Sequence, residues 1–287
     1  MRHLQIRIGP AGFRIGSAWP GPLAAMRDLY AGYPMPQDDI PTHTARIEPT
    51  RFWRRWIRPQ VAICGDHMLM DTVPMALRHG LLAAEMAMNL QMALGERRFL
   101  LLHAAAVERG GKALILTGES GSGKSTLAAM LGEQGWRLLA DEFVLIDPES
   151  MMLHPFPRAV SLKNSAIPEM ERIVADQSRF GPLLRDTPKG HLRHLRPNAD
   201  AIARMDTLAA PALILFPRFG EAPQVQGIGR AELFVRLTQG STNYIPLGER
   251  GYGAMTKLMT LPAAMFAYPD TASGLDIVER YCAEVGL

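Results

Sequence analysis

The chain has 287 residues, of which 47% are hydrophobic and 21% charged, and its formal net charge is +3. These values are ordinary for a globular protein and exclude fibrous and intrinsically disordered classes. A balance of +3 does not by itself indicate a nucleic-acid coat or an anionic membrane surface as partner. Two cysteines, Cys64 and Cys282, cannot build a disulfide framework, and neither belongs to a CxxC pair. The composition therefore favours a cytoplasmic protein in a reducing compartment.

Neither a signal peptide nor a membrane span is predicted. In the first 30 residues Arg, Gly and Pro break every apolar run before it reaches the length of a signal-peptide core. The longest apolar stretch, Val73 to Leu94, carries polar side chains at helical spacing, namely Arg78, His79, Glu85, Asn89 and Gln91. A membrane span needs about 20 residues nearly free of charge. The stretch therefore predicts a buried amphipathic helix.

The charge balance and the apolar pattern both change near Phe99. Residues 1–100 hold 12 basic and 8 acidic side chains, whereas residues 101–287 hold 19 and 20. Before the change, short strand patterns at residues 4–8, 13–15 and 44–47 and a helix over 23–30 predict a small α+β module, residues 1–98. After it, β runs alternate with helices, among them one from Ser125, one near 230–239 and one after Pro269. This alternation predicts an α/β domain over residues 99–287.

A phosphate-binding loop is predicted where the segment KALILT leads into the sequence GESGSGKST. The pattern GxxxxGK[ST] is satisfied, with an apolar strand pattern before it and a helical pattern after it. The residues of the loop and of the helix start are Gly118, Glu119, Ser120, Gly121, Ser122, Gly123, Lys124, Ser125 and Thr126. Glycines let successive backbone N–H groups point at phosphate oxygens, and the helix N-terminus adds partial positive charge. In such loops the lysine reaches the β- and γ-phosphates and the serine hydroxyl binds Mg²⁺. We therefore expect ATP as the bound nucleotide.

Two adjacent acids follow the next strand pattern. Asp141 and Glu142 come after RLLA, sixteen residues beyond Ser125. A carboxylate at a strand end beside a phosphate loop is typical of a Mg²⁺ site, and a second one can accept a proton from an attacking hydroxyl. Two close carboxylates also repel, which raises the pKa of one of them. The alternative is a solvated strand end without a role in catalysis.

Three features together resemble the catalytic domain of HPr kinase/phosphorylase, a P-loop kinase related to ATP-dependent phosphoenolpyruvate carboxykinase. These are His103, fifteen residues before Gly118, the loop GESGSGKS, and the sequence Ala140-Asp141-Glu142. Further segments are similar to the HPr-kinase-related kinases of the "kinase A" group: RPQV, GWRLLADEFVLID, PFPRAVSLKN, FGPLLRDTPKG, HLRP, STNYIPLG and AYPD. The resemblance spans nearly the whole chain. Some members of that group phosphorylate a serine of a ribosomally made precursor peptide, including lasso-peptide precursors.

The resemblance implies roles for individual residues. His103 matches the active-site histidine, Asp141 matches the catalytic base, and Glu142 stands where HPr kinases have a second, metal-binding aspartate. From the residues alone, a buried hydrogen-bonded core residue is the alternative for His103. The glycine-rich signature that follows the acids in bifunctional HPr kinases is not found, so neither phosphorylase activity nor the carrier HPr is implied. HPr kinases are hexamers, which makes a homo-oligomer an expectation here.

Lysine usage supplies two further candidates. The chain has 26 Arg but five Lys, and lysine suits a compact point charge against phosphate. Besides Lys124, Lys163 in SLKN and Lys189 in DTPKG lie in polar, loop-like patterns. We expect Lys163 to bind nucleotide and Lys189 to act in catalysis, exposed surface lysines being the alternative. Asn243 in GSTNY either orients a substrate or caps a helix.

Two charged segments complete the candidates. Phe180 to Pro197 combines glycine and proline with positive charges, which is typical of a lid over a nucleotide site, and a static surface loop is the alternative. The run RFWRRWIR, Arg51 to Arg58, interleaves four arginines with three aromatic side chains. That pattern allows docking of a peptide or of nucleic acid, or simply an edge strand or exposed helix. We expect no nucleic acid among the partners.

These observations together predict an ATP- and Mg²⁺-dependent kinase that phosphorylates a hydroxyl, expected to be serine, on a peptide or small protein. A small-molecule kinase is the alternative among enzymes. A nucleotide-switched accessory module without phosphoryl transfer is the alternative from another class. The acid pair discriminates between the classes, because a module that only binds nucleotide has no need of Asp141 as a base.

Overall fold

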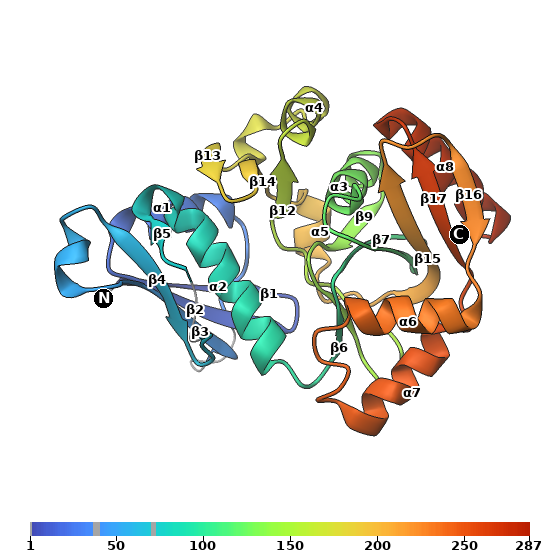
Figure 1. Ribbon diagram of the computed structural model, residues 1–287, viewed down its shortest axis with the longest axis horizontal. Coiled ribbons are helices and arrows are strands. Elements are labelled where there is room, and N and C mark those ends of the chain that lie inside the picture. Colours follow the sequence, from blue (N-terminus) through green and yellow to red (C-terminus); the bar gives the residue numbers. More distant parts are fainter. Residues whose placement is uncertain (1, 37–40, 70–72) are drawn as a thin grey trace. The chain divides into compact units, whose positions relative to one another are not determined.

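The computed structural model describes residues 2–36, 41–69 and 73–287 and divides the chain into two compact units (Figure 1). The first unit comprises Met1–Glu96, Ser161–Glu171 and Ala175–Arg196, and the second comprises Arg97–Val160, Arg172–Val174 and Pro197–Leu287. The first segment of the first unit ends at Glu96, near the predicted boundary between residues 98 and 99. The first unit also contains two later segments that the sequence predicted to be part of the second domain.

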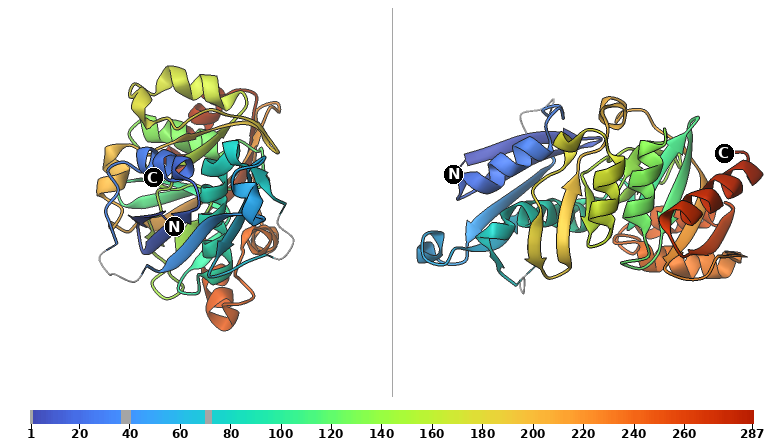
Figure 2. Two further views of the ribbon diagram at one scale, coloured as in Figure 1. Left: turned by 90° about the vertical axis from the view of Figure 1, so that its left-hand side faces the viewer. Right: turned by 90° about the horizontal axis from the view of Figure 1, so that it is seen from above.

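The first unit is built on a five-stranded sheet in the order β1-β2-β3-β4-β5. Its strands are β1 (Arg2–Ile8), β2 (Ala11–Ser17), β3 (His43–Pro49), β4 (Gln60–Gly65) and β5 (Met75–Ala76). The parallel pair β2 and β3 is connected through helix α1 (Pro20–Leu29), and α1 packs beside helix α2 (Gly80–Gly95) against the sheet (Figures 1 and 2). The predicted helix from Val73 starts only at Gly80, because β5 and the short 3₁₀ helix η2 (Leu77–His79) precede it.

The two later segments of the first unit form a second, three-stranded sheet in the order β12-β14-β13. Its elements are β12 (Val160–Lys163), α4 (Ala166–Ile173), the 3₁₀ helix η3 (Gln177–Arg179), β13 (Leu184–Thr187) and β14 (Gly190–Leu195). Most of Phe180 to Pro197, which we expected to be a lid or a surface loop, is thus a β-hairpin formed by β13 and β14.

Long-range hydrogen bonds attach this hairpin to the first unit. The His79 ring nitrogen Nε2 lies 2.9 Å from the Arg185 carbonyl oxygen, and Arg196 donates to the Asp28 carbonyl at 2.9 Å. These contacts join residues more than 100 positions apart, so no local pattern in the sequence predicts them.

The second unit contains a six-stranded sheet in the order β16-β17-β15-β8-β7-β9. The strands are β7 (Ala104–Arg109), β8 (Lys112–Thr117), β9 (Arg137–Ala140), β15 (Ala210–Phe219), β16 (Gln224–Gly227) and β17 (Ala263–Tyr268). Strands β8, β15 and β17 are parallel, whereas β7 runs antiparallel to both β8 and β9. A three-stranded sheet, β11 (Leu153–His154), β10 (Val144–Ile146) and β6 (Leu100–Leu102), completes the strands of this unit.

Helices cover the six-stranded sheet on both faces, which explains why β7 and β8 are buried almost throughout. Ala113 and Ile115 of β8 belong to one core cluster with apolar side chains of α6 (Arg230–Gly240) and α7 (Gly248–Leu258). Helix α3 (Lys124–Glu133) packs on β7, β8 and β9, and also on α8 (Thr271–Glu284) (Figure 1). The short helix α5 (Ala199–Ala203) packs on β9. The second unit therefore has the predicted α/β architecture. In the described part of the chain no helix is long and apolar enough to cross a bilayer.

Candidate functional site

The predicted phosphate loop connects β8 to α3 and depends on glycine for its shape. Gly118, Gly121 and Gly123 have φ angles of 139°, 90° and 94°, a region that side-chain-bearing residues rarely adopt. Lys124 is only 8% exposed, and its ammonium donates to the carbonyl oxygens of Gly118 and Glu119, both at 2.7 Å. The loop thus curls around the lysine, and Ser125 and Thr126 continue into the first turn of α3. Backbone N–H groups in such a first turn have no partner within the helix and favour an anion.

Tyr268, at the end of β17, packs against this loop. A Cβ atom on Gly123 would lie 2.1 Å from the Tyr268 hydroxyl oxygen, and that hydroxyl donates to the Ser122 carbonyl at 3.5 Å. The Tyr268 ring stacks on Phe266 and faces α8 at Gly274, where a Cβ would lie 2.6 Å from the ring. Sequence analysis missed Tyr268 as part of the site, because it is 145 positions from Gly123; the only signal was its place in the segment AYPD.

The strand register brings the predicted site residues to one edge of the sheet. Ala104 pairs with Thr117, and Ala140 pairs with Ala106. His103 before β7, Gly118 after β8 and Asp141 after β9 therefore emerge side by side. His103 Nε2 lies 3.4 Å from Glu142 Oε2, so two predicted residues that are 39 positions apart are in contact.

The surroundings of His103 differ from those of a core histidine. Its side chain is 43% exposed, and its backbone amide donates to the Gly240 carbonyl at 2.7 Å. Its carbonyl oxygen accepts a hydrogen bond from the Thr117 hydroxyl at 3.4 Å. The backbone is thus held by α6 and β8 while the imidazole faces Glu142.

The acid pair combines one buried and one strained residue. Asp141 is buried, which excludes the alternative of a solvated strand end. Glu142 has a φ angle of 78°, a left-handed conformation that costs a non-glycine residue about 1–2 kcal/mol. Strain of this kind gathers at functional sites, where the surrounding structure maintains it. The turn after β9 therefore directs the two carboxylates differently.

Arg158 is a further candidate that the sequence analysis did not single out. Phe156 bridges Ala140 in parallel, and the Phe156 amide donates to the Leu139 carbonyl at 2.7 Å. The chain beyond Phe156 thus leaves β9 in the same direction as the acid pair. Arg158 is buried, with its guanidinium 5.9 Å from the Phe156 ring centroid. A guanidinium is always charged, so this buried cation favours anionic groups at this edge. The segment PFPRAV was its only signal in the sequence.

The residues at this edge fit a Mg²⁺–nucleotide in their chemistry. The Ser122 hydroxyl oxygen is buried and has no hydrogen-bond partner among the described residues, which suits a loop shaped to receive an acceptor. Ser125, Asp141 and Glu142 supply oxygen ligands, the type that Mg²⁺ prefers. The described residues contain no group of three or more His, Cys, Asp and Glu arranged for a metal ion. Mg²⁺ that is held by few protein ligands keeps waters and substrate phosphates in its coordination shell.

The remaining candidates do not belong to the six-stranded sheet. Lys163, at the end of β12, and Lys189, in the turn of the β13–β14 hairpin, belong to the first unit, so their roles stay predictions. Asn243 is fully buried. Its side-chain oxygen accepts a hydrogen bond from the Leu101 amide in β6 at 2.9 Å, and its side-chain nitrogen donates to the carbonyl of Phe99, the residue before β6, at 2.8 Å. Both expectations for Asn243 are therefore wrong, because it holds β6 in place.

Comparison with known proteins gives partial matches. The model of a family described as "SynChlorMet cassette protein ScmC" matches residues 78–173, about a third of the chain. No curated protein matches. Among solved structures, the HPr(Ser) kinase/phosphatase from Coxiella burnetii aligns with 64% of this chain and 98% of its own, at 13% sequence identity and a TM-score of 0.28. The fold and the site stand on the geometry described above.

Proposed function

We propose that this protein is an ATP- and Mg²⁺-dependent kinase that transfers the γ-phosphate to a serine hydroxyl of a peptide or small protein. The observation that carries the proposal is the convergence of three strand ends at one edge of the sheet. The phosphate loop, the His103–Glu142 pair and the buried Asp141 all lie there. A phosphate cradle without reactive side chains would suit nucleotide binding alone, whereas this edge also holds the Asp141 carboxylate, which we assign as the base.

The chain's own groups account for the steps of the transfer. The loop amides and the first turn of α3 bind phosphate oxygens, and the Lys124 ammonium exchanges its bonds to Gly118 and Glu119 for bonds to phosphate. Ser125 and the acid pair would hold Mg²⁺, which would supply neutralising charge at the β- and γ-phosphates. Asp141 accepts the proton of the serine hydroxyl while the new O–P bond forms and the bond between the γ-phosphorus and the β–γ bridging oxygen breaks. His103 positions Glu142.

The first test uses labelled ATP and the peptides encoded beside the gene. The family model is named for a cassette protein, so a short neighbouring open reading frame is the first acceptor to try. Incubation with γ-labelled ATP is expected to label a serine of that peptide. Hydrolysis of ATP without transfer to any peptide would contradict the proposal, and label on a metabolite instead would identify a small-molecule kinase.

Asp141→Asn separates an enzyme from a nucleotide-switched module. Loss of the base is expected to lower the transfer rate ~10²-fold or more, while ATP affinity measured by calorimetry stays within a few fold. Lys124→Ala is the matched comparison, because it removes the phosphate-binding charge and is expected to weaken ATP binding itself. Unchanged activity of Asp141→Asn would show that this carboxylate is not the base.

A further inference from the structure

The chain leaves the five-stranded sheet between β3 and β4 and displays large apolar side chains to solvent. Residues 51–59 form the 3₁₀ helix η1 (Phe52–Arg55) and its flank. Phe52 is 76% exposed and Trp56 is 69% exposed, and Trp53 and Ile57 are exposed beside them. Monomeric proteins seldom gather such side chains without a function. Aromatic side chains mixed with arginine are instead enriched at protein interfaces.

Four arginines, Arg51, Arg54, Arg55 and Arg58, belong to the same segment, and Arg78 lines a hollow together with Arg58. In the described part of the chain no carboxylate forms an ion pair with any of them. The guanidinium of Arg51 lies 5.2 Å from the Trp53 ring centroid, and that of Arg55 lies 5.5 Å from the Trp56 ring centroid. We call these arginines, with Phe52, Trp53, Trp56 and Ile57, the Arg–Trp surface. Among the described residues its charge is uncompensated, so its complement is acidic.

The Arg–Trp surface rests on an ordered support. The Thr50 amide donates to the Gln60 carbonyl at 3.3 Å and so closes the base of the excursion. The indole of the buried Trp19 donates to the Arg55 carbonyl at 2.9 Å. Because the backbone is held at both places, binding of a ligand costs little conformational entropy for ordering this segment.

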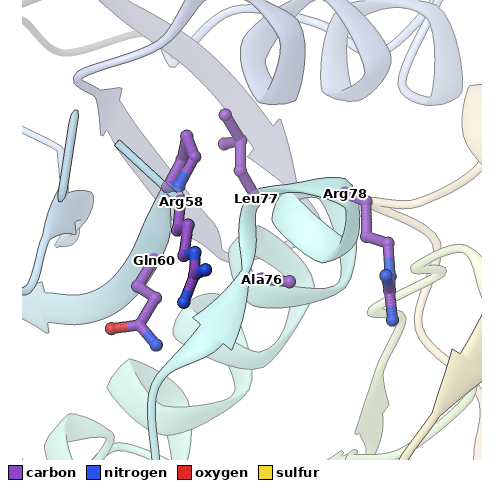
Figure 3. Close-up of a pocket in the computed structure, with 6 residues that line it drawn as sticks. Arg58, Gln60, Ala76, Leu77 and Arg78 are labelled. Atoms are coloured by element: carbon purple, nitrogen blue, oxygen red, sulfur yellow. The ribbon is translucent and has the colours of Figure 1, made fainter. Parts of the chain in front are cut away.

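A hollow of about 380 Å³ adjoins this surface (Figure 3). It is lined by Arg58, Pro59, Gln60, Ala76, Leu77 and Arg78. In Figure 3 the Arg58 and Gln60 side chains stand on one side and Arg78 on the other. Arg58 has a φ angle of 45°, and a strained backbone at a non-glycine residue is typical of a functional position.

We propose that the Arg–Trp surface binds an acidic peptide segment that also carries an apolar side chain. Planar guanidinium groups bind carboxylates in a bidentate manner, and the hollow takes a side chain between Arg58 and Arg78. A peptide is favoured over nucleic acid because Arg51 and Arg55 already cover a face of Trp53 and of Trp56, and base stacking needs open ring faces. The identification of this peptide as the phosphate acceptor rests on the proposed function, whereas the binding itself does not.

A binding assay without ATP tests the surface separately from catalysis. The probe is a short fluorescein-labelled peptide of Glu and Asp with one Leu and one Phe, and its control has Gln and Asn in place of the acids. Fluorescence anisotropy is expected to show binding of the acidic probe alone. Of the four tryptophans, Trp19 and Trp136 are buried, so a shift of tryptophan emission on binding would report on Trp53 and Trp56.

Charge reversal at the surface gives the decisive variants. Arg55→Glu with Arg78→Glu is expected to weaken binding about tenfold or more. Arg2→Glu with Arg27→Glu, which changes charge equally at exposed positions of β1 and α1, is the matched control and is expected to bind as the wild type does. If both double variants lose the same amount of binding affinity, the effect comes from net charge alone and the proposal is overturned.

Arg58→Gly separates a structural role from a binding role. Glycine relieves the strain at a φ of 45°, so the midpoint of thermal unfolding is expected to stay or rise while peptide binding weakens. Unchanged peptide binding by this variant would contradict the proposal. So would a wild-type protein that does not bind the acidic probe, or one that binds a labelled oligothymidylate more tightly than the probe. The probe has no serine, so its binding tests the surface alone, whereas failure of the γ-labelled ATP test would count against the kinase and leave the surface established.

Discussion

At the residue scale, the close approach of Gly123 and Tyr268 makes a sharp prediction. Gly123→Ala adds a Cβ atom 2.1 Å from the Tyr268 hydroxyl oxygen at a φ of 94°. We expect a loss of about 2–4 kcal/mol in the free energy of unfolding, since backbone strain and steric overlap add. ATP binding is expected to weaken as well, because the loop must move. Urea unfolding and calorimetry measure the two effects.

Two companion variants isolate the causes. Gly135 has the same φ of 94°, but a Cβ there would meet nothing within 4 Å, so Gly135→Ala measures strain alone and is expected to cost about 1–2 kcal/mol. Tyr268→Phe removes the overlapping oxygen, and the double variant with Gly123→Ala is expected to recover part of the loss. Strict additivity in this double-mutant cycle would show that the two positions are not coupled.

At the element scale, a buried ion pair joins β7 to β9. Arg137 donates through Nε to the Glu108 carboxylate at 2.6 Å and through Nη1 to the backbone carbonyls of Arg204 and Thr207. Arg137→Met leaves the Glu108 carboxylate buried without this partner, and removal of one member of a buried pair costs about 3–5 kcal/mol. Urea unfolding at pH 7 measures this. The exposed pair Arg250–Glu149 is the comparison, where Arg250→Met is expected to cost at most about 1 kcal/mol.

The same pair makes stability depend on pH. Burial raises the pKa of the Glu108 carboxyl, but hydrogen bonds from the Gly111 amide and the Arg137 guanidinium outweigh burial and hold the pKa below its ordinary value of 4.5. The stabilisation is therefore complete above the unfolded-state pKa and is lost as pH falls through the folded-state pKa. The difference in unfolding free energy between wild type and Glu108→Gln is expected to shrink below pH 4.5. A constant difference would assign the effect to packing.

The β13–β14 hairpin makes a prediction about motion. Gly181, Arg196 and Asn164 donate their amides to the carbonyls of His194, Arg179 and His191, at 2.9–3.0 Å. These amides are expected to exchange slowly with solvent even without nucleotide, whereas the turn at Pro188 and Lys189 stays accessible. Hydrogen exchange followed by mass spectrometry measures this. Fast exchange that slows only when an ATP analogue and peptide are added would support the lid interpretation.

At the scale of the whole molecule, the interleaved units predict how the chain responds to truncation. A chain lacking residues 1–98 loses the ring of His79 and the carbonyl of Asp28, to which the hairpin segment is bonded. Trypsin is expected to cut this variant rapidly at Arg179, Arg185 and Arg193, while full-length protein resists there. Equal resistance of the two chains would show that the segment folds without the first unit.

The sequence by itself determined the glycine-rich loop between β8 and α3 and the alternation of strands and helices in the second unit, because both depend on local chemistry. Positive φ angles at Gly118 and Gly123 require glycine, and apolar runs such as that of β8 form buried strands. The spacing predicted His103 and the acid pair near that loop, and the strand register brings these positions to one edge of the sheet.

The tertiary structure decided what distant residues do. It alone brings Tyr268 against Gly123, His103 against Glu142, and the hairpin after Phe180 into the first unit. It also makes Asn243 a support for β6. These contacts join residues up to 168 positions apart, and their geometry depends on strand register and helix packing. A local pattern of side chains contains neither, because the register is set by the whole sheet and by the turns that connect its strands.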